Sequence, residues 1–452
     1  MYLKLSPGLF AANQPLSASQ KALKLLFGPA SQRRFHVRYW DGTLEGPAQP
    51  TAATLVLNNP AALRRMLLPP SDLALGEAYI FGDFDVEGNL EHLLGQAVSL
   101  ADRLLRPGVL LSLIWQLLKL PDTPRPTPRA AFAETEAQVH SRTRDAQAIR
   151  YHYDVGNDFY QLWLDQRMVY SCAFFQTGDE TLEAAQAAKL ERICRKLRLK
   201  PGEHLLDIGC GWGGLAIYAA QHYGVRVTGI TLSPSQAEIA RERAVAVGVA
   251  EQVSIEIRDY RDVPPGTLYD KIASVGMVEH VGRAKLPRYF SQIAQLLRPG
   301  GLMLNHGIVK EITPAFVSWG FGLLEKYLND HSFIQNYVFP DGDLRRLSEM
   351  NAHAEKVGLE IRDVENLREH YALTLRHWVS RLEAQRHEAI ELSNDVTYRI
   401  WRLYMSGSAQ SFTAGRIGIA QTLFAKPLPG GEAGLPLSRA DVEFVPGEAA
   451  PV

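Results

Sequence analysis

The sequence predicts an α/β protein built on a doubly wound parallel sheet, with a smaller domain at its N-terminus. From residue 180 onward, short aliphatic runs alternate with amphipathic helical stretches, which is typical of parallel strands joined by helices. A glycine-rich turn follows the first of these runs, where such sheets bind ligands. A proline-rich segment separates the first 120 residues from the remainder. A chain of 452 residues is long enough for two or three domains.

Residues 1–120 are expected to form the smaller N-terminal domain. Its longest apolar stretch, Val109–Leu120, is shorter than the roughly 20 residues needed to span a bilayer. Two interpretations stay open: a core or dimer-interface helix, or a helix that lies on a membrane surface. Residues 121–150 are predicted to be a linker, because four prolines exclude a continuous helix there: Pro121, Pro124, Pro126 and Pro128.

Residues 151–430 are expected to hold the main domain, and 431–452 a C-terminal tail. Strands are predicted at 204–208, 225–230, 253–257, 270–275 and 301–305, and the runs 359–364 and 417–424 complete the sheet. Helices are predicted between strands, at about 212–223, 234–247 and 285–297.

Composition excludes several classes of protein. The 48 Lys and Arg against 49 Asp and Glu give a net charge of -1, which argues against nucleic acid as the main partner. The three cysteines, Cys172, Cys194 and Cys210, form no CxxC pair. This argues against a disulfide framework or a structural zinc site and favours a reducing cytoplasm. No His, Asp and Glu cluster has metal-ligand spacing, and the first ten residues lack the apolar core of a secretory signal.

The glycine-rich turn predicts a cofactor site. In the run HLLDIGCGWGG, Gly209, Gly211 and Gly213 allow a sharp turn and close approach of a ligand. A dinucleotide site requires an acid at the end of the next strand, but that strand ends VTGITLS and the following helix offers Gln236. The GK[ST] ending of a phosphate-binding loop is also missing. S-adenosylmethionine, which carries no phosphate, suits such a loop.

Seven motifs stand in the order and spacing of one known family. They are HYDVGNDFYQLWLD, MVYSCAFF, TLEAAQAAKLERICRKL, LLDIGCGWGG, GITLSPSQ, RDYRDV and SVGMVEHVG. Over residues 151–425 the chain resembles the cyclopropane-fatty-acyl-phospholipid synthases and the similar mycolic acid cyclopropane synthases. The run LALGEAYIFGDFDVEGNLEHLL also resembles the lipid-binding N-terminal domain of longer bacterial members. The resemblance implies a Rossmann-like class I fold that uses S-adenosylmethionine to methylate the cis double bond of unsaturated phospholipid acyl chains, forming a cyclopropane ring.

The same resemblance assigns cofactor contacts. Tyr170 and Ser171 would touch the cofactor; Asp207, Gly209, Gly211, Trp212 and Gly213 would surround its methionine part; Thr231 and Gln236 would lie on the ribose side, and Asp259 and Tyr260 beside the adenine. For Asp207 a simpler alternative is a helix cap at the end of a strand.

The implied chemistry is attack of an alkene on a sulfonium methyl, which leaves a carbocation. Aromatic faces stabilise cations in apolar pockets, and the candidates are Tyr153, Phe159, Trp163, Phe174, Phe175 and Trp319, each of which has ordinary core packing as its alternative. In the family a bicarbonate ion is thought to accept the proton. The matching positions here are Cys172, Glu279, His306, Tyr371 and the backbone amide of Ile308. Beside an anion, Glu279 is expected to have a raised pKa.

Several alternatives remain. Loss of a different proton after a hydride shift gives a methylene- or methyl-branched chain in place of the ring, and small amines or a non-catalytic lipid- or cofactor-binding role are further possibilities. Where some members carry a cysteine, this chain has Ser408; activity is still expected, because the mechanism needs no nucleophile. The expected partners are an unsaturated phospholipid, the inner face of a membrane to which a cytoplasmic protein binds peripherally, and a second copy of the chain.

Overall fold

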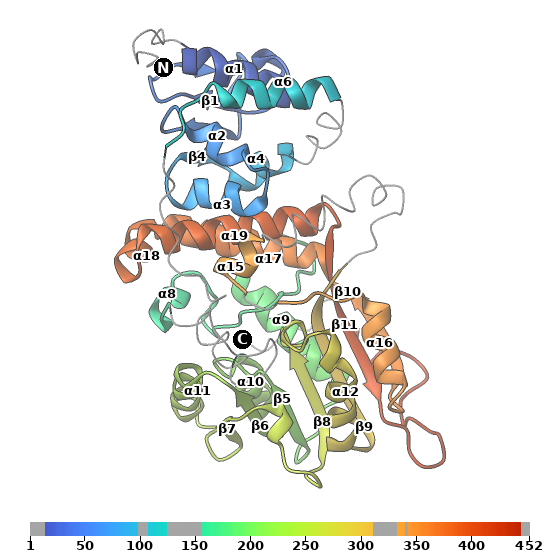
Figure 1. The fold of residues 1–452 in the computed structure, drawn as a ribbon. Coiled ribbons are helices and arrows are strands. Elements are labelled where there is room, and N and C mark those ends of the chain that lie inside the picture. The colour runs from blue at the N-terminus through green and yellow to red at the C-terminus, as the bar shows by residue number, and fades with distance from the viewer. Residues whose placement is uncertain are drawn as a thin grey trace. The chain divides into compact units, whose positions relative to one another are not determined.

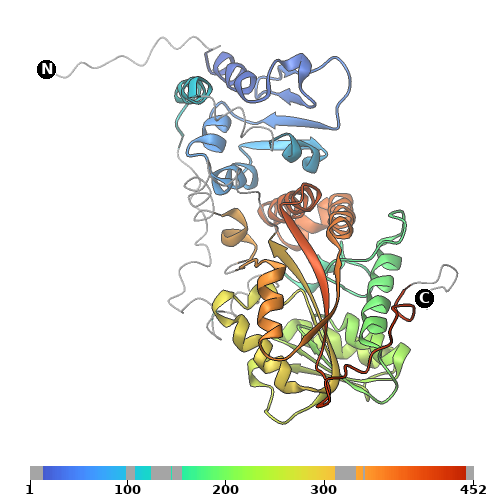
Figure 2. The same cartoon turned by 90° about the vertical axis from the view of Figure 1, so that its right-hand side faces the viewer.

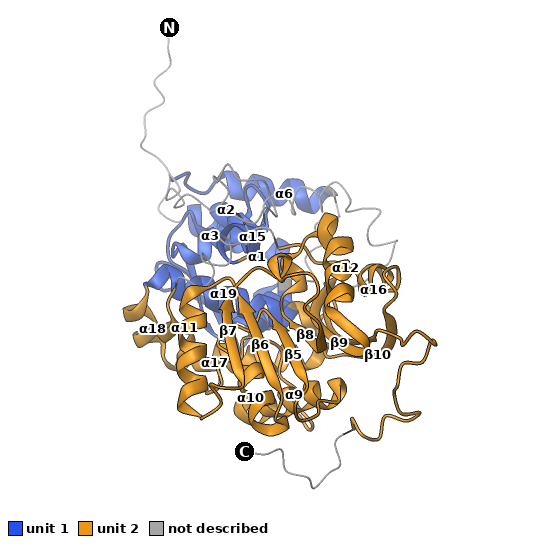
Figure 3. Ribbon diagram, turned by 90° about the horizontal axis from the view of Figure 1, so that it is seen from below, with its two compact units in different colours: residues 1–131, 316–338, 394–410 blue, residues 132–315, 339–393, 411–452 orange. Residues whose placement is uncertain are grey.

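The structure is a computed structural model that describes residues 14–97, 107–123, 144, 155–310, 332–339 and 342–443 (Figure 1). The chain divides into two compact units (Figure 3). The smaller unit comprises residues 1–131, 316–338 and 394–410, and the larger one comprises residues 132–315, 339–393 and 411–452. The smaller unit therefore includes two later segments that the sequence prediction assigned to the main domain.

The larger unit contains a seven-stranded sheet with the order β10-β11-β9-β8-β5-β6-β7; Figure 3 labels β7, β6, β5, β8 and β9 side by side. The strands are β5 (His204–Ile208), β6 (Arg226–Thr231), β7 (Val253–Ile257), β8 (Tyr269–Val275), β9 (Leu297–Lys310), β10 (Glu360–Asn366) and β11 (Ile417–Ala425). The five strands from β9 to β7 are parallel, whereas β11 runs antiparallel to β9 and β10. Otherwise parallel sheets commonly accept antiparallel strands near an edge, so the doubly wound prediction holds for the five strands that surround the glycine turn.

Helices cover both faces of this sheet, as Figure 2 shows with green helices on one side and yellow and orange helices on the other. The helices of this unit are α8 (Asn157–Gln161), α9 (Leu182–Leu197), α10 (Gly214–Tyr223), α11 (Pro234–Ala246), α12 (Leu286–Leu296), α16 (Leu347–Glu355), α17 (Arg368–Ala384) and α18 (Arg386–Leu392). Side chains alternate along β5: Leu205 belongs to the core under α9, α10 and α11, while Leu206 and Ile208 belong to the core under α12 and α16. Asp207 therefore lies on the same face of the sheet as α9.

The smaller unit has a four-stranded sheet with the order β2-β1-β3-β4. Its strands are β1 (His36–Arg38), β2 (Leu44–Glu45), β3 (Ala53–Leu57) and β4 (Phe84–Gly88), and its helices include α1 (Gln14–Phe27), α2 (Ala62–Leu67), α3 (Asp72–Ile80), α4 (Leu90–Ala97), α6 (Pro107–Leu118) and α15 (Phe333–Tyr337). Residues 395–410 of α19 (Asp395–Thr413) belong to this unit. The buried Arg402 links this part of α19 to α3 and β4. Its guanidinium donates to Tyr79 Oη at 2.8 Å and to the carbonyls of Val86 and Gly88.

Helix α6 is the apolar stretch singled out in the sequence. It packs against α1 (Figure 1) and buries Leu113 and Leu117. Its other face is apolar and exposed, with Leu111 at 70% and Trp115 at 62% of full exposure. In the described part of the chain, no helix is both long enough and apolar enough to cross a membrane.

Candidate active site

The glycine turn lies at the carboxyl end of β5, between two pockets. Gly209, Gly211 and Gly213 have φ of +79°, +53° and +79°, which side-chain-bearing residues rarely adopt. The backbone N–H groups of Gly209 and Cys210 donate to the Ile230 carbonyl at 2.9 and 3.0 Å, so the turn is fixed against β6. A Cβ on Gly209 would lie 3.2 Å from Met277 Cγ. The absence of a side chain at Gly209 therefore allows its backbone to lie close to the Met277 side chain.

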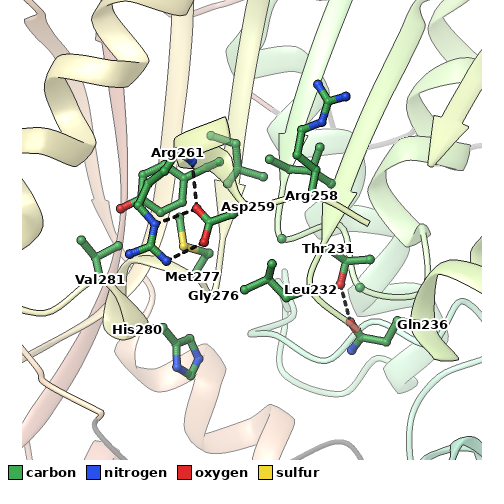
Figure 4. Close-up of a pocket in the computed structure, with 15 residues that line it drawn as sticks. Thr231, Leu232, Gln236, Arg258, Asp259, Arg261, Gly276, Met277, His280 and Val281 are labelled. Carbon is green, nitrogen blue, oxygen red and sulfur yellow. Dashed lines mark hydrogen bonds and ion pairs between the residues drawn. The ribbon is translucent and has the colours of Figure 1, made fainter. Parts of the chain in front are cut away.

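Both pockets are lined by residues that the sequence assigned to the cofactor. The first pocket, drawn in Figure 4, is lined by Gly209, Gly211, Thr231, Gln236, Asp259 and Tyr260 among others. The second is lined by Tyr170, Ser171, Asp207 and Trp212, and it shares Gly209, Gly211 and Gln236 with the first. Of the eleven predicted residues, only Gly213 lines neither pocket. It precedes α10, and a Cβ there would lie 3.1 Å from Ala240 Cβ, so a glycine at this position lets the chain pack closely against α11.

Polar side chains in the first pocket are held by one another. Thr231 Oγ1 donates to Gln236 Oε1 at 2.9 Å, and Asp259 forms an ion pair with Arg261 (Figure 4). Asp259 Oδ1 also accepts from the Arg261 backbone N–H at 2.9 Å. The carboxylate predicted to lie beside the adenine is therefore paired with a cation two residues away, and Arg258 is a second cation in the lining of this pocket.

The second pocket contains a buried acid and a buried base. Asp207 is 2% exposed, and its Oδ2 has no hydrogen-bond partner in the described structure. Burial raises the pKa of Asp207 to about 7, against the opposing effect of Lys189. Burial lowers the pKa of Lys189, on α9, to about 8, and its Nζ donates to Ser171 Oγ at 2.8 Å. The sequence analysis did not identify Lys189, although a lysine in the buried stripe of an amphipathic helix is a detectable signal.

Glu279 and Ile308 are in direct contact. The Ile308 N–H donates to Glu279 Oε1 at 2.6 Å, so the amide assigned to the anion is bonded to Glu279 here. Glu279 Oε2 is buried without a hydrogen-bond partner in the described chain. Burial raises the pKa of Glu279 to about 7, and the Ile308 amide opposes this effect. The direction agrees with the expectation from the sequence, and the structure attributes it to loss of hydration.

His306 lies two residues before Ile308 on β9, so the two side chains share a face of the sheet. It is fully buried, and Gln421 on β11, its partner in the register, places Nε2 3.0 Å from His306 Nδ1. In that orientation the amide donates to Nδ1, so the neutral ring carries its proton on Nε2. Burial holds the pKa of His306 well below its ordinary value, and His306 Nε2 has no hydrogen-bond partner among the described residues.

Cys172 and Tyr371 both bond to the Leu367 carbonyl. The Cys172 thiol lies 3.7 Å from this oxygen and 3.2 Å from the Ala173 carbonyl oxygen, and the Tyr371 backbone N–H donates to the Leu367 carbonyl at 3.1 Å. Leu367 in turn donates its N–H to the Ile419 carbonyl on β11, and Ile419 is the register partner of Ile308. These links connect Cys172, Tyr371, Ile308 and Glu279 through neighbouring backbone. Burial raises the pKa of the Cys172 thiol, so it is a neutral donor and not a nucleophile.

The aromatic candidates divide into three groups. Phe159 and Trp163 join a buried cluster with Tyr160, Tyr170 and Trp378, in which Trp163 and Trp378 have ring centroids 5.5 Å apart. Tyr371 meets Trp378 edge-on at 6.0 Å. Phe174 and Phe175 instead stack on His370 and His377. Tyr153 and Trp319 lie outside the described residues. The sequence analysis missed Tyr160 and Trp378, whose proximity depends on the packing of α8 against helices distant in sequence.

The sequence analysis also expected no metal site and no catalytic role for the position of Ser408. In the described ranges, no group of three His, Cys, Asp or Glu side chains is arranged to hold a metal ion. Ser408 is buried in α19, in the part that belongs to the smaller unit, and it lines neither pocket.

Comparisons with known proteins identify relatives of this chain. The family model described as mycolic acid cyclopropane synthetase matches residues 140–422, and a domain of unknown function matches residues 22–108. The chain is 42% identical over 407 residues to a probable fatty acid methyltransferase of Pseudomonas putida, covering 90% of this chain and 95% of the relative. It is 34% identical to the cyclopropane-fatty-acyl-phospholipid synthase of Escherichia coli K12, covering 84% of this chain and 89% of that enzyme.

A solved structure, mycolic acid cyclopropane synthase CmaA1 complexed with SAH and CTAB, has a TM-score of 0.58 and 32% identity; the match covers 62% of this chain and 97% of that one. The larger unit is thus a Rossmann-like class I S-adenosylmethionine-dependent methyltransferase fold. The chain belongs to the mycolic acid cyclopropane synthetase family. Its activity class is S-adenosylmethionine-dependent methyl transfer to lipid acyl chains.

Proposed function

We propose that this protein transfers the methyl group of S-adenosylmethionine to the cis double bond of an unsaturated acyl chain in a phospholipid and forms a cyclopropane ring. The electron pair of the alkene forms the new C–C bond while the S–CH3 bond breaks, which leaves a cation on the neighbouring carbon. A C–H bond of the transferred methyl then breaks, its electron pair closes the ring, and its proton passes to a base.

The observation that carries this proposal is a pair of buried polar atoms without hydrogen-bond partners in the described structure, Glu279 Oε2 and His306 Nε2. Buried polar groups of this kind are uncommon and need an explanation. With a pKa near 7, Glu279 offers an O–H donor in its protonated form, and His306 offers an N–H donor. Two neutral donors in a dry site suit a small anion that accepts a proton.

The bicarbonate ion fits this chemistry. Glu279 and His306 would hold it, with the Cys172 thiol and the Tyr371 hydroxyl as further donors. When bound, the anion would supply the base, since the lone pair of His306 Nδ1 already accepts from the Gln421 amide and the protonated form of Glu279 acts as a donor. The residues themselves hold the donors in place, since Glu279 is fixed by the Ile308 amide and His306 by Gln421.

The aromatic cluster supports the cation step. The rings of Tyr160, Trp163 and Trp378 pack around the ring of Tyr170, which lines the second pocket. Cation–π attraction reaches about 2 kcal/mol in a desolvated site. Tyr170 is the member of this cluster that lines the pocket, so we assign the stabilisation of positive charge to its ring.

A second candidate product is a methylene-branched acyl chain, or a methyl-branched chain that keeps a double bond; both arise from the same cation by loss of a proton after a hydride shift. The relative at 42% identity is named as a probable fatty acid methyltransferase, which favours this outcome. Proton NMR of the lipid product distinguishes the two, since cyclopropane protons resonate in a region that exomethylene protons do not share. Signals of an exomethylene group or a branched methyl, without cyclopropane signals, would overturn ring formation and leave methyl transfer standing.

A lipid substrate implies a site of action at a membrane. We infer peripheral association of a cytoplasmic protein with the inner membrane face, and a homodimer. The exposed apolar face of α6 supports the first inference. Sedimentation with unsaturated phospholipid vesicles tests it; the protein should pellet with vesicles at low salt, and failure to pellet at any salt concentration would refute it.

A further inference from the structure

Lys189 is a charged residue in a place that normally takes an apolar one. On α9 the buried stripe includes Leu182, Ala185, Leu190 and Ile193, and Lys189 lies within it at 1% exposure. A fully buried ammonium is costly unless it is paired. In the described structure its hydrogen bonding is limited to Ser171 Oγ at 2.8 Å, which uses one of its three N–H donors.

The neighbouring acids do not fully account for this cation. Asp165 is the largest favourable charge near Lys189. However, its two oxygens already accept from the backbone N–H groups of Val169 and Arg167 at 2.8 and 3.0 Å. Asp207 lies farther away than an ion pair, and its Oδ2 accepts no hydrogen bond from the described chain. Lys189 and Asp207 therefore line the same pocket as an incompletely satisfied cation and an incompletely satisfied anion.

We propose that Lys189, together with the Ser171 hydroxyl to which it donates, binds the α-carboxylate of the cofactor, opposite Asp207, which accepts from its α-ammonium. This inference rests on the proposed use of S-adenosylmethionine and adds a residue to its site. An α-amino acid end is a zwitterion, and the pocket presents the complementary pair of charges. With Asp165 and Asp207 ionised and Lys189 protonated, these three groups carry one net negative charge. The bound sulfonium cofactor carries one net positive charge and balances it.

The neighbouring segment is built to hold this arrangement. Gln186, one turn before Lys189 on α9, donates to the carbonyls of Val169 at 3.2 Å and Ser171 at 2.9 Å. One helix thus fixes both the backbone and the hydroxyl of the segment that lines the pocket. Lys189 both supplies charge and sets the orientation of Ser171.

The test compares ligands with and without the amino-acid end. S-adenosylhomocysteine carries the zwitterion, decarboxylated S-adenosylmethionine lacks the carboxylate, and 5′-methylthioadenosine lacks the whole amino-acid end. Calorimetric titration of full-length wild type and Lys189→Met measures the three dissociation constants. We expect Lys189→Met to weaken S-adenosylhomocysteine about 10- to 100-fold, the usual effect of losing a charge-assisted hydrogen bond. The affinities for the other two ligands should change less than about threefold.

A matched control is Lys196→Met. Lys196 is another buried lysine of α9, but it forms ion pairs with Asp363 and Glu365 and lines neither pocket. Its replacement should leave the ratio of the affinities for S-adenosylhomocysteine and 5′-methylthioadenosine unchanged. Lys189→Arg should restore part of the selectivity.

The outcomes separate this inference from the proposed function. Equal weakening of all three ligands by Lys189→Met would assign Lys189 a purely structural role and overturn the inference. If Lys189→Met does not fold, Ser171→Ala provides the same comparison, and a uniform effect there would also overturn it. Failure of the wild type to bind S-adenosylhomocysteine at all would instead refute the proposed cofactor.

Discussion

Replacing Glu279 by Gln isolates the chemistry of one carboxyl oxygen. Glutamine keeps the shape of the side chain and an acceptor for the Ile308 N–H, which donates to Oε1 at 2.6 Å. The change falls on Oε2, the buried atom without a hydrogen-bond partner in the described chain. Since Glu279 lines neither pocket, affinity for the cofactor should be unchanged.

The expected loss is in turnover. Removing a group that holds or accepts a proton in the transition state costs about 10²- to 10⁴-fold. The variant should also be more stable at high pH. The pKa of Glu279 rises from 4.5 in the unfolded chain to about 7 in the fold, so the folded state binds the proton more tightly. The stability that the glutamic acid contributes is complete below pH 4.5 and is lost as the pH rises to 7. Above pH 7 the glutamine variant should therefore gain ~3 kcal/mol relative to the wild type.

Three measurements test this reasoning. Calorimetry with S-adenosylhomocysteine gives the affinity, a labelled-methyl assay with unsaturated phospholipid vesicles gives the turnover, and urea unfolding between pH 4.5 and 8 gives the stability difference. Unchanged turnover would remove Glu279 from the active site. A stability difference that does not grow with pH would show that the carboxyl group is hydrated, contrary to its burial.

Three further predictions concern separate features. The affinity for S-adenosylhomocysteine should rise about tenfold per pH unit up to pH 7, because the α-ammonium requires an ionised Asp207 whose pKa is about 7. Asp207→Asn should abolish this dependence. If titration calorimetry gives the same change of affinity with pH for this variant as for the wild type, the assignment is contradicted. Arg402→Met should destabilise the smaller unit by about 3 kcal/mol, because it leaves Tyr79 and two carbonyls without a buried donor. Urea unfolding measures the free energy of unfolding, and an unchanged value would show that the guanidinium is dispensable. Ser408→Cys should change turnover less than about threefold, since no thiol nucleophile is needed; a large gain in the methyl-transfer assay would restore a catalytic role to that position.

The strands around the glycine turn were predictable because their residues are local signals. The strand predicted at 204–208 matches β5 and the strand predicted at 253–257 matches β7. Short aliphatic runs bounded by turn residues define where a strand begins and ends. The run at 301–305 is the centre of a longer strand, Leu297–Lys310. The ends of this strand are set by its pairing with β8 and β11. The residues of a short sequence segment do not show which strands will pair with it.

The site was predictable only in part, for a similar reason. The residues of the glycine turn and the strand that follows it are contiguous in sequence and line the two pockets. Lys189 was missed because a lysine is usually assigned to a solvated helix face, although its position in the buried stripe of α9 is a signal that the sequence contains. Trp378 was missed because it joins Trp163 across more than 200 residues of chain. The contact between Glu279 and Ile308 likewise depends on the register of β9.

The fate of the methyl hydrogens tests the central proposal most directly. Wild-type protein is incubated with unsaturated phospholipid vesicles and S-adenosylmethionine deuterated in its methyl group, and the acyl products are analysed by mass spectrometry. Because ring closure removes one proton from the transferred carbon, the product should retain two of the three deuterium atoms and show the ring protons of a cyclopropane by NMR, and Glu279→Gln should form little of it. An exomethylene product would also retain two deuterium atoms, so the NMR signals distinguish it from the ring. Acyl chains that retain all three deuterium atoms would contradict deprotonation of the methyl group at this site.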